Sequence, residues 1–171
     1  MIEIRTGRLR LRKATIADLE AMHAILADRR ATAFWSTPPH GDLDQTHEWL
    51  RSMIDIPAGE GEDFIVEHEG SVIGKAGLYR FPEIGFILRP DCWGRGFAGE
   101  ALRAVIGRAF SVHRLDRIEA DVDPRNARSL ALLARLGFVE TGRKANSWQM
   151  GETWCDSVYL RLLPEDWPAG G

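Results

Sequence analysis

Cysteine is scarce in this chain of 171 residues, which contains only Cys92 and Cys155. Two cysteines do not make a disulfide framework, and these two do not form a C-x-x-C pair. No apolar run is long enough to cross a bilayer, and the first residues lack the apolar core of a signal peptide. We therefore expect a protein of the reducing cytoplasm with no membrane partner, and we expect no metal site.

A strong charge of either sign is also missing, because 22 lysines and arginines face 25 acidic residues and the formal net charge is −3. Without a basic field the chain is not expected to bind nucleic acid. The basic stretch 8–13 alternates with apolar residues as a strand does, and it has no interleaved aromatic side chain. Length and composition predict one domain, residues 1–167, followed by a short flexible tail at 168–171.

The most informative stretch is a predicted strand, Glu83–Leu88, followed by a loop with Gly94, Gly96 and Gly99 and then a predicted helix. The helix is indicated by apolar residues at steps of three and four: Phe97, Ala98, Ala101, Leu102, Val105, Ile106, Ala109 and Phe110. Glycines let backbone N–H groups approach a ligand, and the first turn of a helix attracts anions. With Arg95 beside them, these amides predict a phosphate site; glycines that serve only the turn are the alternative.

Two familiar nucleotide loops do not fit this stretch. It has no Gly-Lys-Ser/Thr of a P-loop, and no full G-x-G-x-x-G followed by an acidic residue about 20 positions later. The segment 93–98, Trp-Gly-Arg-Gly-Phe-Ala, resembles the pyrophosphate loop Q/R-x-x-G-x-G/A of the GNAT acyltransferases. Trp93 departs from that general pattern but resembles the RimJ/RimL-like branch, which acetylates the N-termini of ribosomal proteins.

Three further segments carry the same resemblance. Asn126-x-x-Ser129 followed by the Leu-Gly-Phe of 136–138 is similar to the second GNAT signature, about 30 residues after the first. Residues 151–159 resemble a C-terminal hairpin of RimJ/RimL-like members, and the Glu-Ile-Gly-Phe of 83–86 resembles their Glu-Ile-Gly-Tyr. The resemblance covers nearly the whole chain and is weakest from residue 34 to residue 62.

The order of predicted elements is that of an α/β (α+β) protein with a mixed sheet. Strands are expected at 8–12, 64–67, 72–79, 83–88 and 117–122, then two strands near 138–144 and 147–150, and a last one at 154–163. Helices are expected at 15–26, 42–57, 97–110 and 126–137. Residues 59–63 are expected to form a polar turn. The resemblance implies the GNAT fold, in which a largely antiparallel seven-stranded sheet is flanked by about four helices and its central strands are splayed.

The resemblance also implies that acetyl-CoA is the donor and that a primary amine attacks it directly in a ternary complex. That amine is either a protein N-terminus or a small molecule. The residues expected to contact the cofactor are Phe86, Ile87, Leu88, Trp93, Gly94, Arg95, Gly96, Phe97, Ala98, Gly99, Asn126 and Ser129. The adenosine phosphate could meet Arg89, Arg125 or Arg128. A sensor that binds acyl-CoA without turnover is the alternative function.

The chemistry needs a neutral amine and a proton for the leaving thiolate. An α-amine with a pKa of about 8 is roughly one-tenth neutral at pH 7, so a carboxylate must accept a proton. The resemblance makes Glu83 the first candidate, with Glu119 and then Asp121 in reserve. Many relatives use a tyrosine to protonate the thiolate, but this chain has leucines and an alanine at 130–133. Ser129 is therefore the candidate that would donate a hydrogen bond to the sulfur. Its alternative role is a local helix cap.

Six tryptophans suggest an aromatic-lined cleft for the acceptor, although tryptophans that only cover the core are the alternative. The residues expected to bind the acceptor are Phe34, Trp35, His40, Trp49, Trp148 and Trp154. Because relatives are often dimers, a homodimer is a possible assembly. Cys92 adjoins the loop but has no base beside it in the sequence, so we do not expect it to act as a nucleophile, and Cys155 is expected in the core.

Overall fold

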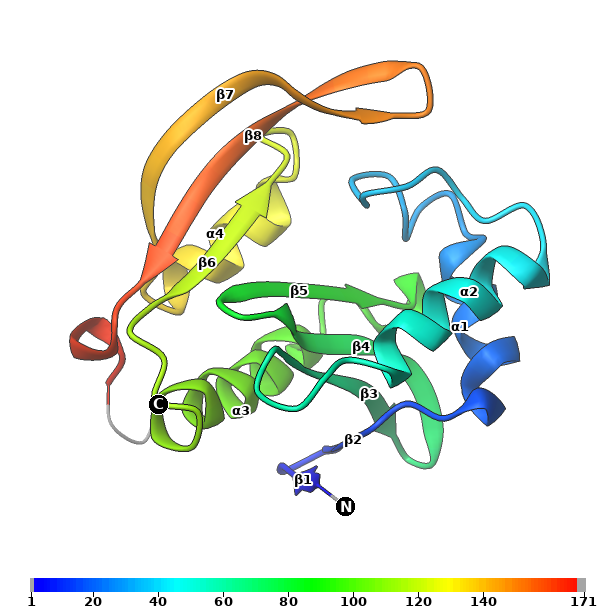
Figure 1. The fold of residues 1–171 in the computed structure, drawn as a ribbon, viewed down its shortest axis with the longest axis horizontal. Helices are drawn as coiled ribbons and strands as arrows, with labels where there is room; N and C mark the ends of the chain where they lie inside the picture. Colours follow the sequence, from blue (N-terminus) through cyan, green and yellow to red (C-terminus); the bar gives the residue numbers. More distant parts are fainter. Residues whose placement is uncertain (1, 169–171) are drawn as a thin grey trace.

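The computed structural model describes residues 2–168, so residues 169–171 of the expected tail lie outside the described residues. The described chain forms one eight-stranded sheet in the order β1-β2-β3-β4-β5-β6-β8-β7 (Figure 1). The strands are β1 (Glu3–Arg5), β2 (Leu9–Arg12), β3 (Glu62–His68), β4 (Ser71–Arg80), β5 (Glu83–Leu88), β6 (Ile118–Val122), β7 (Val139–Met150) and β8 (Thr153–Leu162). Neighbouring strands are antiparallel except β5 and β6, which are parallel.

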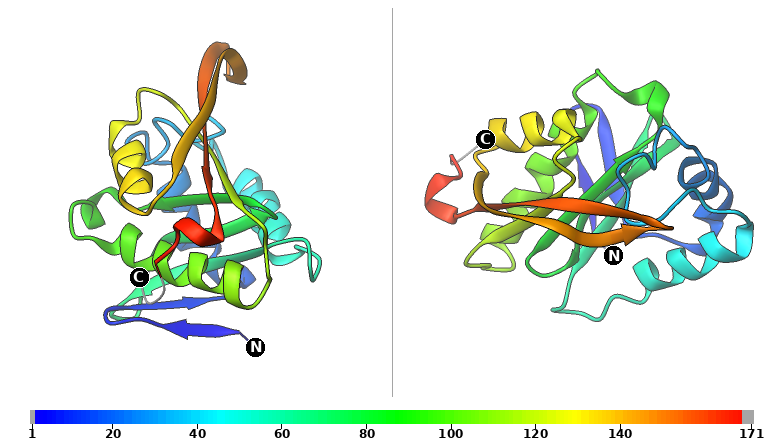
Figure 2. Two further views of the ribbon diagram at one scale, coloured as in Figure 1. Left: turned by 90° about the vertical axis from the view of Figure 1, so that its left-hand side faces the viewer. Right: turned by 90° about the horizontal axis from the view of Figure 1, so that it is seen from above.

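Helices cover both faces of this sheet, as the two views of Figure 2 show. The α-helices are α1 (Leu19–Leu26), α2 (Leu43–Ile54), α3 (Phe97–Ser111) and α4 (Ala127–Arg135), and the short 3-10 helices are η1 (Ile16–Asp18), η2 (Pro90–Cys92) and η3 (Pro164–Asp166). The apolar stripes of α3 and α4 pack into the larger core with Phe64, Leu78 and Leu160 of the sheet. A second core on the other face joins α1 and α2 to Ile65 and Ile87. Alternate residues of β3 and β5 thus serve opposite faces.

The parallel neighbours β5 and β6 separate almost at once. They share one pair, Glu83 with Glu119, whereas β6 pairs with β8 over five positions, from Ile118 to Val122. β6, β7, β8 and α4 therefore lean away from β5, which opens a wedge in the sheet (Figure 1). The expected splay of the central strands is confirmed, and the edge of β5 after Glu83 that faces β6 carries no neighbouring strand in the described chain.

Three local expectations were wrong in detail. The sheet has eight strands rather than seven, because the three residues of β1 pair with β2 and are too few to show an alternating pattern. Residues 138–144 and 147–150 belong to one strand, β7, whose register shifts between Lys144 and Trp148. The expected polar turn at 59–63 ends earlier, because Glu62 and Asp63 are buried in β3 and neutralised by Arg108 and Lys75.

Leu102→Ala tests whether the α3 face of the sheet holds the main core. Leu102 is fully buried, and truncating a buried leucine leaves a cavity that costs about 2–5 kcal/mol of unfolding free energy. Urea unfolding followed by circular dichroism should show this loss. Leu43→Ala is the control, because Leu43 is 39% exposed on α2 and its truncation should cost under about 0.5 kcal/mol. Equal losses in both variants would contradict this account of the core.

Candidate active site

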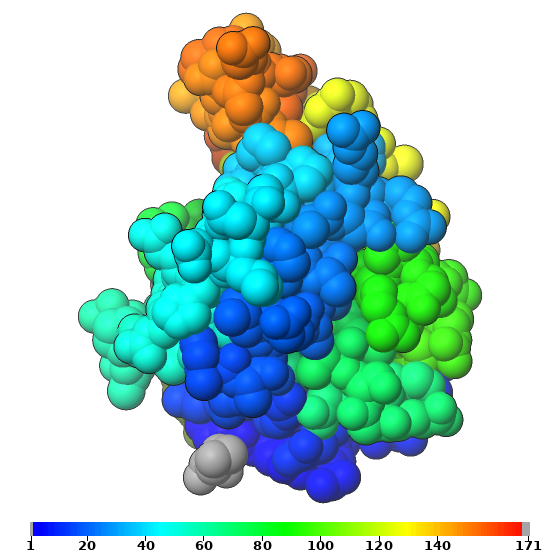
Figure 3. All heavy atoms as spheres, turned by 90° about the vertical axis from the view of Figure 1, so that its right-hand side faces the viewer, coloured from blue at the N-terminus to red at the C-terminus, as the bar shows by residue number. Residues whose placement is uncertain are grey.

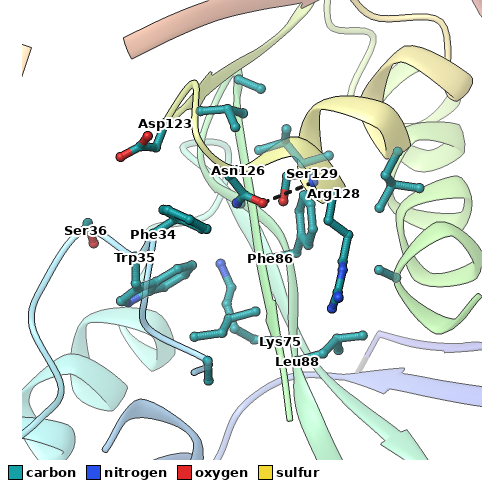
Figure 4. Close-up of a pocket in the computed structure, with 18 of the residues that line it drawn as sticks. Phe34, Trp35, Ser36, Lys75, Phe86, Leu88, Asp123, Asn126, Arg128 and Ser129 are labelled. Atoms are coloured by element: carbon teal, nitrogen blue, oxygen red, sulfur yellow. Dashed lines mark hydrogen bonds between the residues drawn. The ribbon is translucent and has the colours of Figure 1, made fainter. Parts of the chain in front are cut away.

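A large cavity of about 1300 Å³ lies where β5 and β6 diverge. Figure 4 shows it bounded by β5, by the start of α4 and by the segment that carries Phe34 and Trp35. The cofactor and acceptor residues expected from the sequence that line it are Phe34, Trp35, Trp49, Phe86, Ile87, Leu88, Trp93, Gly94, Gly96, Phe97, Ala98, Gly99, Asn126, Ser129 and Trp148. One continuous cavity therefore joins the glycine loop to the aromatic residues.

The glycine loop presents unpaired backbone donors at one end of this cavity. Gly94 and Gly96 have φ values of 73° and 80°, a left-handed conformation that glycine adopts without strain. A β-carbon at Gly94 would meet nothing within 4 Å, so the approach to its backbone is open. The N–H groups of residues 94–99 donate to no protein acceptor in the part of the chain that the structure describes. Together with the N-terminus of α3 they form a cradle for an anion.

Trp93 fixes this loop to the end of β5. Its indole Nε1 donates a hydrogen bond of 3.0 Å to the carbonyl of Leu88, and the guanidinium of Arg128 lies 4.5 Å from the centre of its ring. Arg128 reaches over from α4, and it forms no ion pair with any described residue. The unusual tryptophan in the first position of the loop thus connects β5, the loop and α4 beside the cradle.

Two other arginines near the cradle already form ion pairs. Arg125 is bound to buried Asp123 at 2.7 Å and stacks on Phe34, and Arg89 is bound to Asp91 at 2.6 Å. Arg95 lies over the ring of Phe97, and it is the one residue of the expected cradle that does not line the cavity. Of the three arginines considered for the adenosine phosphate, Arg128 is therefore the one whose charge is available.

Ser129 faces the cavity from the first turn of α4. The expected N-cap is confirmed, because the side chain of Asn126 accepts a hydrogen bond of 3.2 Å from the backbone N–H of Ser129. The cap is thus formed by Asn126, and the hydroxyl of Ser129 has no hydrogen-bond partner among the described residues. That hydroxyl is available to a ligand, as Figure 4 shows.

The three candidate carboxylates differ in their surroundings. Glu83 accepts two hydrogen bonds from Arg80, and Glu119 is bound to Arg117 at 2.6 Å; neither lines the cavity. Asp121 lines the cavity from β6 and has no ion-pair partner among residues 2–168. Partial burial raises the pKa of Asp121 above its ordinary value; the hydroxyl of Ser157 opposes this rise, and the negative charge of Glu83 adds to it.

Two expected acceptor residues lie outside the cavity lining. His40 is buried against the start of α2, where its Nδ1 shares a 2.7 Å hydrogen bond with Thr46, and burial lowers its pKa. Trp154 is 57% exposed on β8, and its neighbour Cys155 is buried, because successive strand residues point to opposite faces. Cys155 lies in the interior as expected. Cys92 lines the cavity, but burial raises the pKa of its thiol and keeps it protonated.

Sequence reasoning missed an ion pair in the cavity wall. Lys75 and Asp63 both line the cavity, and Tyr79, on the same strand as Lys75, lies beside them. Because residues 59–63 were expected to form a polar turn, Asp63 was not recognised as a buried strand residue. The position of Lys75 between Gly74 and Ala76, inside a predicted apolar strand, was the signal that could have identified it.

The mouth of the aromatic end lies under the β7–β8 hairpin. In Figure 3 this hairpin stands directly above the segment that includes residues 30–50. A β-carbon at Gly151, in the hairpin turn, would lie 3.6 Å from the ring of Pro38. The hairpin and the loop that follows α1 therefore meet across the open side of the wedge.

The chain matches the model of the acetyltransferase (GNAT) domain over residues 8–139, and it belongs to this family. It is similar to an uncharacterized N-acetyltransferase, p20, of Bacillus licheniformis, with 33% identity over 80% of this chain and 82% of that one. It is also 30% identical to an L-methionine sulfoximine/L-methionine sulfone acetyltransferase of Pseudomonas aeruginosa, over 89% of this chain and 92% of that one. The protein is thus an acyltransferase that uses acetyl-CoA.

Two solved structures have the same fold. One is the spermidine N-acetyltransferase of Vibrio cholerae in complex with CoA and spermine, with a TM-score of 0.81, 23% identity, and coverage of 94% of this chain and 98% of that chain. The other is the ribosomal-protein-S5-alanine acetyltransferase of Vibrio fischeri, with a TM-score of 0.81, 22% identity, and coverage of 98% and 100%. No helix within residues 2–168 is long and apolar enough to span a membrane.

Gly96→Glu tests the cradle. The β-carbon of the new side chain would lie 3.3 Å from a guanidinium nitrogen of Arg8, and the substitution adds bulk and a negative charge to the loop that carries the free amides. We therefore expect the affinity for CoA, measured by calorimetry, to fall at least tenfold. Gly70→Glu is the matched control, because Gly70 has a φ of 79° against 80° at Gly96 but lies in the β3–β4 turn with open space around it. Both variants carry the same backbone strain, so an equal effect on CoA binding would contradict a role for the loop.

Proposed function

We propose that this protein transfers the acetyl group of acetyl-CoA to a primary amine that attacks directly in a ternary complex. The observation that supports this most is the single cavity, which places a backbone cradle for a diphosphate and an aromatic cleft for an acceptor on either side of the divergence of β5 and β6. Acetyl-CoA supplies the activated acetyl group when it is bound. A ternary complex needs both ligands in one cavity, and this cavity of about 1300 Å³ includes both the cradle and the aromatic cleft.

The residues present fit the donor. The free N–H groups of residues 94–99 would hold the diphosphate, and Arg128 would add a positive charge on the other side of Trp93. The edge of β5 over Phe86–Leu88, which has no strand beside it in the described chain, would hydrogen-bond the amides of pantetheine. Asn126 and Ser129 keep the contacts to the cofactor that the sequence predicts for them.

Asp121 is our preferred base. A base must lie within hydrogen-bond reach of the amine, directly or through one water, and Asp121 is the one of the three candidate carboxylates that lines the cavity. Its pKa is raised, which strengthens it as a proton acceptor, whereas Arg80 and Arg117 hold Glu83 and Glu119 in ion pairs. The first choice from the sequence, Glu83, remains the competing prediction.

Ser129 would stabilise the thiolate of CoA as it leaves. Its hydroxyl faces the cavity while Asn126 supplies the helix cap, so it is free to donate a hydrogen bond to the sulfur of CoA. The acceptor class remains a choice between a protein N-terminus and a small amine. The RimJ/RimL-like branch, the cytoplasmic location and the homodimer also stay predictions.

Asp121→Asn and Glu83→Gln separate the two candidate bases. Thiol release from acetyl-CoA is measured with a panel of amines, and the affinity for CoA is the control that should not change. Removing a general base costs about 10²–10⁴-fold in rate, so Asp121→Asn should lower kcat by about 100-fold, while Glu83→Gln should stay within about threefold. The opposite order would restore Glu83 as the base. CoA binding with no turnover of any amine by the wild type would favour the sensor.

The pH profile gives an independent test. A base acts when deprotonated, so kcat/KM for the wild type should rise with pH as Asp121, whose pKa is raised, loses its proton. It should rise again at higher pH as the amine loses its proton. In Asp121→Asn the lower step should be missing and the upper step unchanged. A lower step that survives in Asp121→Asn would exclude Asp121 as the group that titrates.

A further inference from the structure

A buried ion pair lies in the wall of the cavity on the acceptor side. Lys75 on β4 and Asp63 on β3 are 2% and 3% exposed, and the ammonium nitrogen is 2.9 Å from a carboxylate oxygen. Removing both charges from water costs several kcal/mol per ion before their attraction is counted, so such a pair is a poor way to stabilise a sheet. Its place in a cavity wall suggests a role in binding.

The ammonium of Lys75 has hydrogen-bond donors that no described residue accepts. It carries three N–H groups, and Asp63 is its one polar partner among the described residues. The other close groups are two aromatic rings, Trp35 and Tyr79, whose centres lie 5.9 and 5.7 Å from the nitrogen. Rings attract a cation but do not offer it oxygen atoms. Two N–H donors therefore remain for oxygen atoms of a ligand.

Lys75 lies over the point where the sheet opens. Its strand neighbour is Ile87 of β5, and a β-carbon at Gly85 would lie 3.6 Å from its nitrogen. A β-carbon there would also lie 3.2 Å from the ring of Tyr79, so the absence of a side chain at Gly85 lets the ammonium and this ring lie together over β5, two residues beyond Glu83, where β6 turns away. Figure 4 shows Lys75 pointing from the sheet into the cavity beside Trp35.

Two of the charged groups that line the cavity lie on opposite sides of the wedge. The cation Lys75 projects from β4, and the carboxylate of Asp121 projects from β6 into the same cavity. An acceptor that carries both an ammonium and a carboxylate matches this arrangement, since each of its charged groups finds the opposite sign. A polyamine has no group for Lys75, and its positive charges would be repelled there.

We propose that Lys75, held in place by Asp63, binds the carboxylate of the acceptor, and that the substrate class is an α-amino acid. The amine of the acceptor then faces Asp121, and its side chain packs against an apolar wall formed by Phe34, Trp35, Trp49 and Met53. This inference rests on the proposed function and makes its substrate class specific. Asp63 is a positioning residue, because it touches Lys75 and not the acceptor.

The test compares amino acids with the amines that remain when the carboxylate is removed. The pairs are L-leucine with 3-methylbutylamine, L-phenylalanine with 2-phenylethylamine, and L-methionine with 3-(methylthio)propylamine. Binding to CoA-saturated protein is measured by calorimetry. For the wild type we expect at least one acid to bind at least tenfold more tightly than its matched amine. If no acid binds more tightly than its amine, the proposal is overturned.

The variant is Lys75→Met with Asp63→Asn, because Lys75→Met alone would leave a buried carboxylate without a partner. We expect this double variant to lose the preference for the acid while its affinity for the matched amine changes less than about twofold. Equal loss of both ligands would make the pair structural and overturn the proposal. Arg108→Met with Glu62→Gln removes a comparable ion pair that does not line the cavity, so it should keep the preference.

Turnover is read separately in the same samples. Thiol release with the same six compounds tests the proposed function, while the binding preference tests the carboxylate site. Absence of turnover with a clear binding preference would remove the acetyltransferase proposal and leave the site. If the amines and the acids are turned over with equal kcat/KM and bind with equal affinity, the acetyltransferase proposal stands and the carboxylate site is overturned.

Discussion

The cavity exists because β5 and β6 stop pairing through their backbones after one position. After the single pair between Glu83 and Glu119, β6 turns to β8, and the edge of β5 is left without a neighbouring strand in the described chain. Backbone N–H and C=O groups left in this way must find partners in water or in a ligand. The break in the sheet is thus a candidate binding site, and its location decides where the glycine loop, α4 and the aromatic residues come together.

The two halves of the cavity use different parts of the chain. On the cofactor side the contacts available are mostly backbone groups, in the glycine loop and along β5, and these depend on conformation more than on residue type. On the acceptor side they are side chains, namely the aromatic wall, Asp121 and the Lys75–Asp63 pair. In the proposed assignment the shared fold accommodates the common donor, and single residues on the acceptor side select the amine.

Local rules predicted much of this fold and the donor half of the candidate site. Some signals depend only on residues close together in the sequence, namely the apolar period of α3, the cap at Asn126 and the three glycines. The structure confirms the helices and the turn that they predict. The errors arose where distant residues decide. Three-residue β1 exists because β2 lies beside it, and Asp63 can be buried because Lys75 comes from the next strand.

The sequence by itself determined the family, the donor loop and the order of strands and helices, because each depends on contacts within a few residues or on a motif that tolerates little change. Only the tertiary structure decided which charged groups enter the cavity. The sequence ranks Glu83 first among the candidate carboxylates, then Glu119, then Asp121. Arginines nearby neutralise the first two, and the divergence of β5 and β6 exposes the third, since the availability of a charge depends on what surrounds it in space.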